Sequence, residues 1–232
     1  MLFKTGMILA FSTLWMGQIH AQTTPINQRD TEGKRHGVWK KFYDHTEQLQ
    51  YEGTFKHGKE TGTFKFYSPK GGKPIATKTY RAKDDTLVLK FYNQSGDFLK
   101  SEGTMVGKSR EGIWKYYKKG YKENLLMTEA YHNNQLHGAK TIYFPDGKIT
   151  EIEHYSHGQK EGKKQVYSFN GQLLQSYTYK NGKLHGPSTV YDASGEKISE
   201  GAYKNGLRYG EWKFYTKGKL DSTQTYPIRP LE

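Results

Sequence analysis

Histidine is the first residue type in this chain that could do chemistry, because imidazole binds metal ions and transfers protons near neutral pH. Three of the nine histidines precede a glycine at one recurring position: His36, His137 and His185. Their spacing is that of a β-hairpin repeat, in which equivalent residues lie about 9.6 Å apart, whereas two ligands of one zinc ion lie at most about 4.2 Å apart. These histidines therefore cannot share a metal ion. We expect them to bond to backbone beside the glycine, and we predict no metal site.

Paired carboxylates are the second candidates, because two of them can supply the acid and base of glycoside hydrolysis. Glu111, Glu161 and Glu211 lie within a residue of recurring glycines, so they belong to the repeat and form no unique pair. Two tight acidic clusters remain, at residues 151–153 (Glu-Ile-Glu) and 84–85 (Asp-Asp), and both are typical of solvated surface.

Other catalytic signatures are missing from the sequence. The chain has no cysteine, which excludes a disulfide, a zinc-thiolate site and a cysteine nucleophile. It also has no Gly-x-Ser-x-Gly elbow, phosphate loop or dinucleotide fingerprint. We therefore predict a protein that is not an enzyme, has no catalytic residues and binds no cofactor.

Basic and aromatic side chains suit binding better than catalysis. The 232 residues carry a net charge of +13 and include 19 tyrosines, 11 phenylalanines and 4 tryptophans. Lysines recur beside the tyrosines, where they either form a basic stripe or keep an exposed sheet soluble. The predicted binding surface consists of Trp39, Trp114, Trp212, Tyr67, Tyr117, Tyr215, Lys65, Lys115 and Lys213.

A repeat must position all of these residues. Tyrosines recur every 24 to 26 residues, at Tyr43, Tyr67, Tyr92, Tyr117, Tyr143, Tyr167, Tyr191 and Tyr215. A glycine stands five or six residues before most of them. We interpret these residues as repeat turn glycines: Gly37, Gly62, Gly112, Gly138, Gly162, Gly186 and Gly210.

Each unit has the pattern of one β-hairpin and a connection to the next. Asn205-Gly206 marks a tight turn, where glycine supplies a positive φ. Trp212 and Phe214 fall on one face and Lys213 on the other, since strand side chains alternate. We predict an all-β fold, an elongated repeat sheet or solenoid of about eight stacked antiparallel hairpins that extends on the order of 75 Å.

Departures from the pattern carry further predictions. Insertions gather in the connections after the tyrosines, above all at residues 118–127. In the third unit Leu87 replaces the glycine, which predicts an irregular turn or bulge. In three middle units the tryptophan position holds another residue, so the apolar face thins there: Lys140, Lys164 and Ser188.

The first residues have the pattern of a secretory signal peptide, with Lys4, an apolar run at 7–17 and the small Ala21 before the expected cut. Eleven apolar residues fall short of the roughly 20 that span a bilayer. We expect an exported protein that is periplasmic, on the outer surface or secreted. The predicted organisation is a signal peptide at 1–21, a lead-in at 22–32, a repeat domain at 33–226 and a tail at 227–232.

Written as x-x-Gly-x-Trp-Lys-x-Tyr-x-x-x-Gly, with His-Gly at 36–37, 137–138 and 185–186, the unit resembles a MORN repeat. The chain looks most like an exported member of the bacterial MORN-variant class, some members of which are labelled antitoxins. The resemblance covers about residues 33–226 in eight units, one of them degenerate. It implies stacked β-hairpins that serve as scaffolds or binding surfaces, with lipid, protein and self-association roles. No catalytic residues belong to the pattern.

Three functions fit these observations. The leading hypothesis is a non-enzymatic scaffold of the cell envelope that binds another envelope or surface protein through the basic and aromatic sheet. The alternatives are attachment to anionic lipid or envelope polymer, and binding of glycan or peptidoglycan by exposed tryptophan and tyrosine. Self-association is also expected, because an exposed tryptophan face would be a large apolar patch. Export argues against nucleic acid as a partner.

Overall fold

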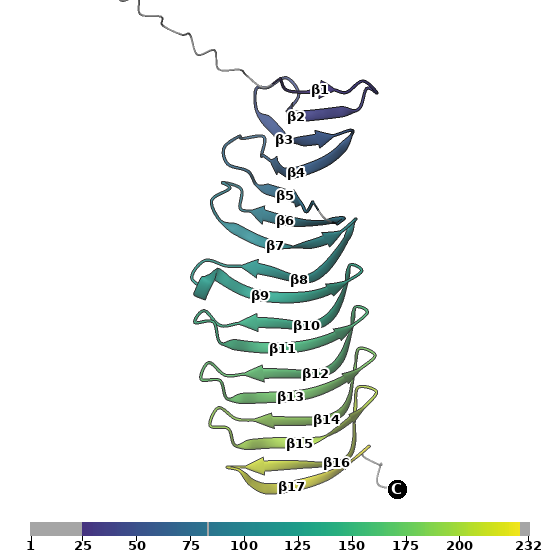
Figure 1. The fold of residues 1–232 in the computed structure, drawn as a ribbon. Helices are drawn as coiled ribbons and strands as arrows, with labels where there is room; N and C mark the ends of the chain where they lie inside the picture. The colour runs from purple at the N-terminus through teal and green to yellow at the C-terminus, as the bar shows by residue number, and fades with distance from the viewer. Residues whose placement is uncertain (1–24, 83, 228–232) are drawn as a thin grey trace, which may run out of the picture.

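The computed structural model describes residues 25–82 and 84–227, and the predicted signal peptide lies outside them. These residues form one open antiparallel sheet of 17 strands, which confirms the predicted all-β repeat sheet (Figure 1). The elements are β1 (Gln28–Arg29), β2 (Arg35–Phe42), β3 (Leu49–Lys56), β4 (Lys59–Phe66), β5 (Ala76–Tyr80), β6 (Thr86–Tyr92), β7 (Leu99–Val106), β8 (Ser109–Tyr117), η1 (Lys122–Asn124), β9 (Leu125–His132), β10 (Gln135–Tyr143), β11 (Ile149–Ser156), β12 (Gln159–Tyr167), β13 (Leu173–Lys180), β14 (Lys183–Tyr191), β15 (Lys197–Lys204), β16 (Leu207–Thr216) and β17 (Lys219–Tyr226).

Each strand pairs with the next strand along the chain and contacts mainly its sequence neighbours, so the described residues form a single layer. β1 belongs to the predicted lead-in, and its two residues pair with β2. In the described part of the chain, no helical segment has the length and hydropathy of a membrane span.

Hairpin turns lie along one edge of the sheet and the longer connections along the other (Figure 1). In the turn at Asn205-Gly206 both residues have positive φ, 53° and 90°, as a type I′ turn requires. The longest connection, residues 67–75, joins β4 to β5. The insertion predicted at 118–127 consists of residues 118–124, which include η1, and the start of β9.

The repeat glycines lie inside strands rather than in turns, which corrects the prediction for Gly37, Gly62, Gly112, Gly138, Gly162, Gly186 and Gly210. All have positive φ. In β8, for example, Glu102 pairs with Lys115 but Thr104 pairs with Glu111, so Gly103 faces the three residues 112–114. Two extra residues make a β-bulge, which bends the strand. The same shift recurs in the hairpins that contain Gly62, Gly138, Gly162, Gly186 and Gly210.

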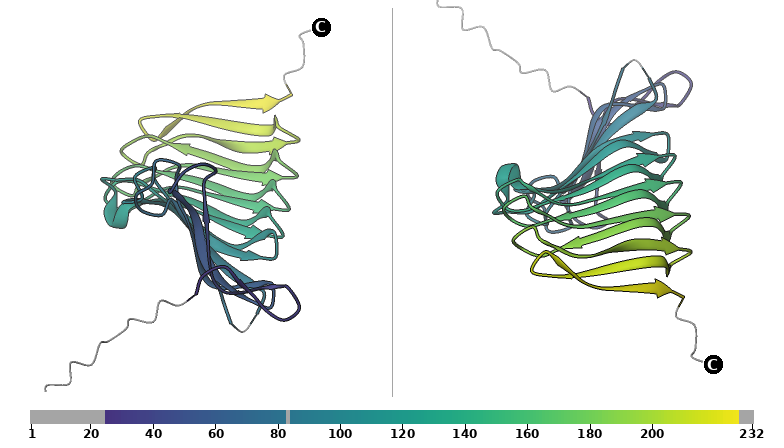
Figure 2. Two further views of the ribbon diagram at one scale, coloured as in Figure 1. Left: turned by 90° about the horizontal axis from the view of Figure 1, so that it is seen from above. Right: turned by 90° about the horizontal axis from the view of Figure 1, so that it is seen from below.

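Bending at the same place in successive hairpins shapes the sheet into a trough (Figure 2). We call the side that carries Phe64 and Trp114 the inner face, and the side that carries Lys65 and Lys115 the outer face. Rings on the inner face are buried although the sheet has one layer: Phe64 is 1%, Trp212 2% and Trp114 4% exposed. The part of each hairpin beyond the bulge folds over them.

Each of these rings lies against a glycine of the preceding strand. A Cβ atom at Gly103 would clash with the Trp114 ring, and one at Gly201 would clash with Trp212. The indole N–H of Trp114 donates to the carbonyl of Thr104 at 3.1 Å, which fixes the ring across the strand. Ring and glycine thus form one packing unit, in which the aromatic side chain covers backbone that the glycine leaves bare.

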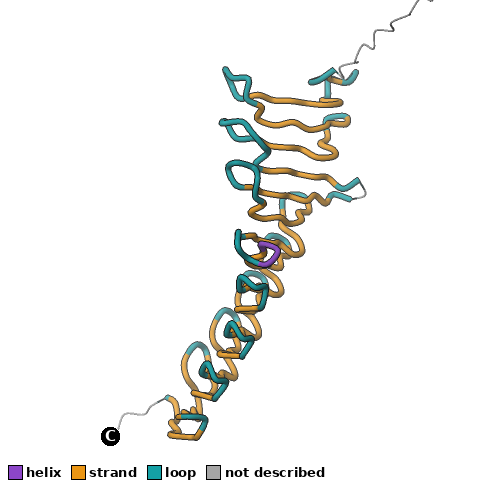
Figure 3. The backbone as a smooth tube through the Cα atoms, turned by 90° about the vertical axis from the view of Figure 1, so that its left-hand side faces the viewer, coloured by secondary structure: helices purple, strands orange, loops and turns teal. Residues whose placement is uncertain are grey.

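The third hairpin lacks this bend. β5 and β6 pair without interruption from Ala76–Phe91 to Tyr80–Leu87, so the hairpin with Leu87 has no bulge. The predicted irregularity falls in its turn, where five residues (81–85) replace the usual two. Figure 3 shows the N-terminal strands face-on and the C-terminal hairpins edge-on, so the trough also twists along its length.

Candidate binding surfaces

Lysines and tyrosines of the outer face are joined to glutamates that the sequence analysis missed. Tyr67 donates to Glu52 at 2.8 Å, and Lys65 Nζ lies 3.2 Å from the same carboxylate. Burial would raise the pKa of Glu52, but these two bonds outweigh it and lower that pKa. Burial and the bond to Glu52 raise the pKa of Tyr67 to about 12. The same cluster recurs at Tyr117, Glu102 and Lys90, and at Tyr215, Glu200 and Lys197.

These pairs make the outer face less basic than its lysines suggest. Lys115 is exposed and faces Glu102 across the sheet, and Lys213 Nζ lies 3.5 Å from Glu211. Lipid attachment through a continuous basic stripe therefore has less support than the composition alone suggests, because the outer-face lysines Lys65, Lys115 and Lys213 each have a carboxylate beside them.

The predicted surface is divided between two faces, because its tryptophans lie on the inner one. Trp114 and Trp212 are buried and Trp39 is half-buried, so the expectation of an exposed tryptophan face was wrong for Trp114 and Trp212. The reason is the bulge, which folds the distal part of the hairpin over the ring: the guanidinium of Arg110 lies 5.0 Å from the Trp114 ring centre, and that of Arg208 lies 4.5 Å from Trp212. These two rings are not accessible to a glycan.

In the middle units the inner face changes from aromatic to charged, and the exchange is complementary. Where Lys140 replaces tryptophan, Glu129 replaces the glycine opposite; Glu153 likewise faces Lys164. Where Ser188 replaces tryptophan, the opposite residue is Tyr177. In the two Lys–Glu pairs the opposite charges compensate each other, and in the Ser–Tyr pair a large side chain on one strand compensates for a small one on the other.

Glu153 is the most strongly held of these charges. Its side chain is 7% exposed, and it receives Lys160 Nζ at 2.6 Å, Lys164 Nζ at 2.9 Å and the Tyr155 hydroxyl at 2.8 Å. Burial alone would raise the pKa of Glu153, but the three donors outweigh it and hold the pKa at about 2. Burial and the bond to Glu153 raise the pKa of Tyr155 in turn. This acidic cluster, predicted as solvated surface, thus belongs to the interior of the trough.

One row of directly paired residues crosses the outer face from strand to strand. It is charged toward both ends, with Glu52 facing Lys65 near one end and Glu200 facing Lys213 near the other. Between them, six consecutive strands contribute uncharged residues. This neutral strip consists of Thr128, Thr141, Ile152, Gln165, Ser176 and Thr189. Adjacent strands lie about 4.8 Å apart, so the strip is about 24 Å long.

A hollow of about 990 Å³ opens at the third hairpin, where the bend is missing. Its lining mixes both charges, and Lys78 Nζ lies 2.7 Å from Glu60 across it. Asp84, on its rim, accepts the backbone N–H of Thr86 at 3.0 Å, so this carboxylate supports its own turn.

The repeat histidines take a different place from the one predicted. Among the described residues, the rings of His36, His137 and His185 make no bond to backbone. His36 instead faces His57, with ring centres 4.9 Å apart, and His137 faces His157 at 5.0 Å. The partners stand in the adjacent hairpin turn and not in the same repeat position, so the spacing argument against shared metal does not apply to them.

A single-layer sheet of stacked hairpins with two long faces defines the class: this is a β-hairpin repeat scaffold, which offers surfaces for binding. Comparison with protein families then gives the repeat type, since the model of the MORN repeat variant matches residues 136–157, 160–181 and 184–205. Residues 136–205 thus contain three consecutive MORN repeats of the variant type, and the predicted resemblance is confirmed in these units. They are also the units that carry most of the neutral strip. Comparison with curated proteins finds no match.

Proposed function

We propose that this protein is a non-enzymatic scaffold of the cell envelope that binds another protein on its outer face. The neutral strip carries the proposal. Thr128, Thr141, Ile152, Gln165, Ser176 and Thr189 lie side by side on six strands, with no charge between them. Burying such a row against a partner desolvates no ion, whereas burying the Lys–Glu clusters at either end would.

Tyrosines border this strip and strengthen the argument. On either side of the strip, Glu52, Glu102 and Glu200 each stand 15 residues before the tyrosine that they bond. Before Tyr143, Tyr167 and Tyr191 that position holds Thr128, Ile152 and Ser176. Tyr143, Tyr167 and Tyr191 therefore lack the glutamate that accepts a hydrogen bond from the equivalent tyrosine in the three units with Glu52, Glu102 and Glu200. Their hydroxyls suit polar groups of a partner. Tyrosine is enriched at protein interfaces because it joins a large apolar ring to a polar tip.

The envelope location rests on the sequence of residues 1–21, which has the charged start, apolar run and small residue of a signal peptide. An exported partner, in the periplasm or on the surface, is the class of protein that an exported scaffold can meet.

Affinity capture with matched variants tests the proposal. Residues 22–232 are immobilised and incubated with envelope extract of the source organism, in parallel with the variant Thr141→Lys/Thr189→Lys, which places two charges in the neutral strip. The control is Thr223→Lys/Thr225→Lys, which adds the same charges to the outer face of β17, away from the strip. We expect the strip variant to lose the captured protein and the control to keep it. Equal capture by both variants, or binding to envelope that has been stripped of protein by protease, would contradict a protein partner on the strip.

A further inference from the structure

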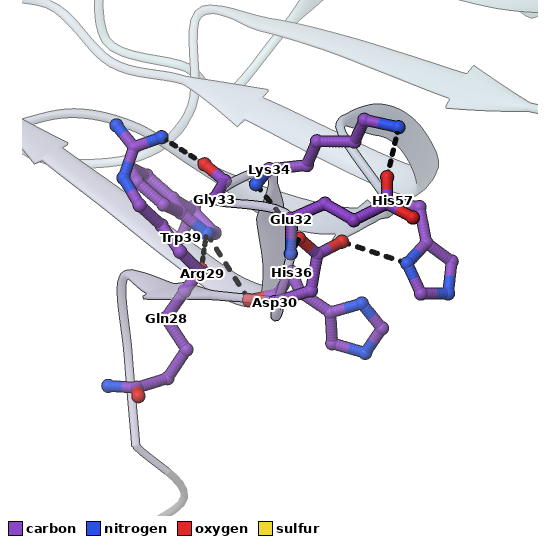
Figure 4. A network of polar contacts seen from close by, with 9 residues as sticks. All are labelled: Gln28, Arg29, Asp30, Glu32, Gly33, Lys34, His36, Trp39 and His57. Carbon is purple, nitrogen blue, oxygen red and sulfur yellow. Dashed lines mark hydrogen bonds and ion pairs between the residues drawn. The ribbon is translucent and has the colours of Figure 1, made fainter.

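Three segments bring potential metal ligands together at the N-terminal end of the turn edge (Figure 4). Asp30 follows β1, His36 lies in β2, and His57 lies in the turn between β3 and β4. One ligand atom from each residue lies within 4.8 Å of the other two. Nδ1 of His57 is 2.8 Å from Oδ2 of Asp30. Within residues 25–82 and 84–227, this is the one group of three histidine or acidic side chains that converges so closely.

The carboxylate is fixed before any ion arrives. The Asp30 side chain is 10% exposed, and its Oδ1 accepts the backbone N–H groups of Glu32 at 3.0 Å and Lys34 at 2.8 Å. Oδ2 is thereby directed at the histidine side (Figure 4). Hydrogen bonds of this kind orient metal ligands in established sites.

Both histidines can adjust to an ion because their side chains are exposed. Ligand atoms of one tetrahedral zinc ion lie about 3.4 Å apart. The contact of 2.8 Å must therefore widen slightly and the longest separation must shorten, which rotation of the two rings achieves without moving the backbone. Neutral imidazole and carboxylate are ligands that zinc accepts, and three protein ligands leave one position for water.

We propose that Asp30, His36 and His57 bind a divalent zinc ion. The ion links the lead-in, the first strand of the repeat and the first hairpin turn, and so adds to the backbone pairing of β1 with β2. The second histidine pair lacks this arrangement: near His137 and His157, Glu111 bonds to Nδ1 of His132 at 2.6 Å and to the backbone N–H of Asn133 at 3.0 Å.

Calorimetric titration with zinc chloride tests the site. The host is residues 22–232 without a histidine tag, stripped with chelator, and carrying His137→Ala/His157→Ala so that the second histidine pair does not contribute. Three changes are made in this host: His57→Ala, Asp30→Asn, and the control His185→Ala, which removes a histidine of the same repeat position as His36. Asparagine keeps an oxygen for the two backbone N–H groups of the Asp30 loop, so the loop is preserved. Circular dichroism checks that each variant folds.

We expect the host to bind one zinc ion per chain, and its unfolding temperature to rise when zinc is present. His57→Ala and Asp30→Asn should each weaken binding at least tenfold, while His185→Ala leaves it unchanged. Failure of the host to bind zinc at millimolar concentration, or unchanged affinity in both His57→Ala and Asp30→Asn, overturns the proposal.

Discussion

The substitution Glu153→Gln tests how much the buried carboxylate in the middle of the trough contributes to stability. The substitution keeps the shape of the side chain and removes its charge from Lys160, Lys164 and Tyr155. The fall of the Glu153 pKa from 4.5 to about 2 corresponds to about 3 kcal/mol of folding free energy at neutral pH, at about 1.4 kcal/mol per pKa unit. We expect the variant to lose up to about 3 kcal/mol of unfolding free energy at pH 7.

The pH dependence gives the same prediction a second readout. A carboxyl whose pKa is lower in the folded state stabilises the fold above the unfolded pKa, and that stabilisation disappears as pH falls through the folded pKa. The difference between wild type and variant should therefore shrink between about pH 5 and pH 2, and should be about 1.4 kcal/mol at pH 3.

Urea unfolding measures both quantities. Tryptophan fluorescence reports β2, β8 and β16 through Trp39, Trp114 and Trp212, and circular dichroism reports the whole sheet, which matters because repeat arrays can unfold in parts. The control is Glu211→Gln. Glu211 is 59% exposed and pairs with Lys213 at 3.5 Å, so its loss should change stability by less than about 0.5 kcal/mol. A loss below about 1 kcal/mol for Glu153→Gln at pH 7, or a loss that does not shrink in acid, would refute the reasoning.

Two further predictions concern the outer face and the bulges. Because the pKa of Tyr67 is raised to about 12, its bond to Glu52 should stabilise the fold below about pH 10, and this stabilisation should be lost as pH rises toward 12. Tyr67→Phe should therefore remove one high-pH step from a titration of tyrosinate absorbance. An unchanged titration curve would count against the raised pKa of Tyr67. Gly162→Ala should cost about 1 to 2 kcal/mol in urea unfolding, since alanine is strained at a φ of +92°; a neutral result would mean that the bulge tolerates ordinary φ.

The sequence predicted the sheet well because the fold depends on local patterns. Alternation around Trp212 and Phe214 correctly placed them on one face, and Asn205-Gly206 marked a true turn. The glutamate partners were also within reach, since Glu52 stands 15 residues before Tyr67 and the same interval recurs in two other units. Extending the repeat backward from the tyrosines would have found them.

Burial of the tryptophans was harder to predict, because alternation says which face a side chain takes and nothing about whether that face bends closed. The signal was the glycine before Trp114. Gly112 stands too far from the turn glycine Gly107 to belong to the same tight turn and too close to it to mark a second turn after another strand, so one of them had to lie within a strand. The His36–His57 contact needed more than the repeat, because it joins two different repeat positions through the strand register.

The balance between opposite residues on the inner face leads to a prediction that tests whether the pairs are exchangeable. Tyr177 faces Ser188 in one hairpin, and Gly201 lies under Trp212 in the next. Trp212→Ser alone removes a buried ring and should cost about 3 to 5 kcal/mol. Gly201→Tyr alone drives a side chain into the indole and should also destabilise the sheet.

Together, the two changes convert the last pair into a copy of the preceding one. The tyrosine then occupies the space that the indole left, so the double variant should be more stable than the sum of the single changes predicts, with a coupling energy of about 1 to 3 kcal/mol. Urea unfolding of the wild type, both single variants and the double variant gives this energy directly. If the losses of unfolding free energy in the two single variants simply add up in the double variant, the two residues do not compensate for each other. The complementary exchange along the inner face would then depend on residues around each pair as well as on the two residues in contact.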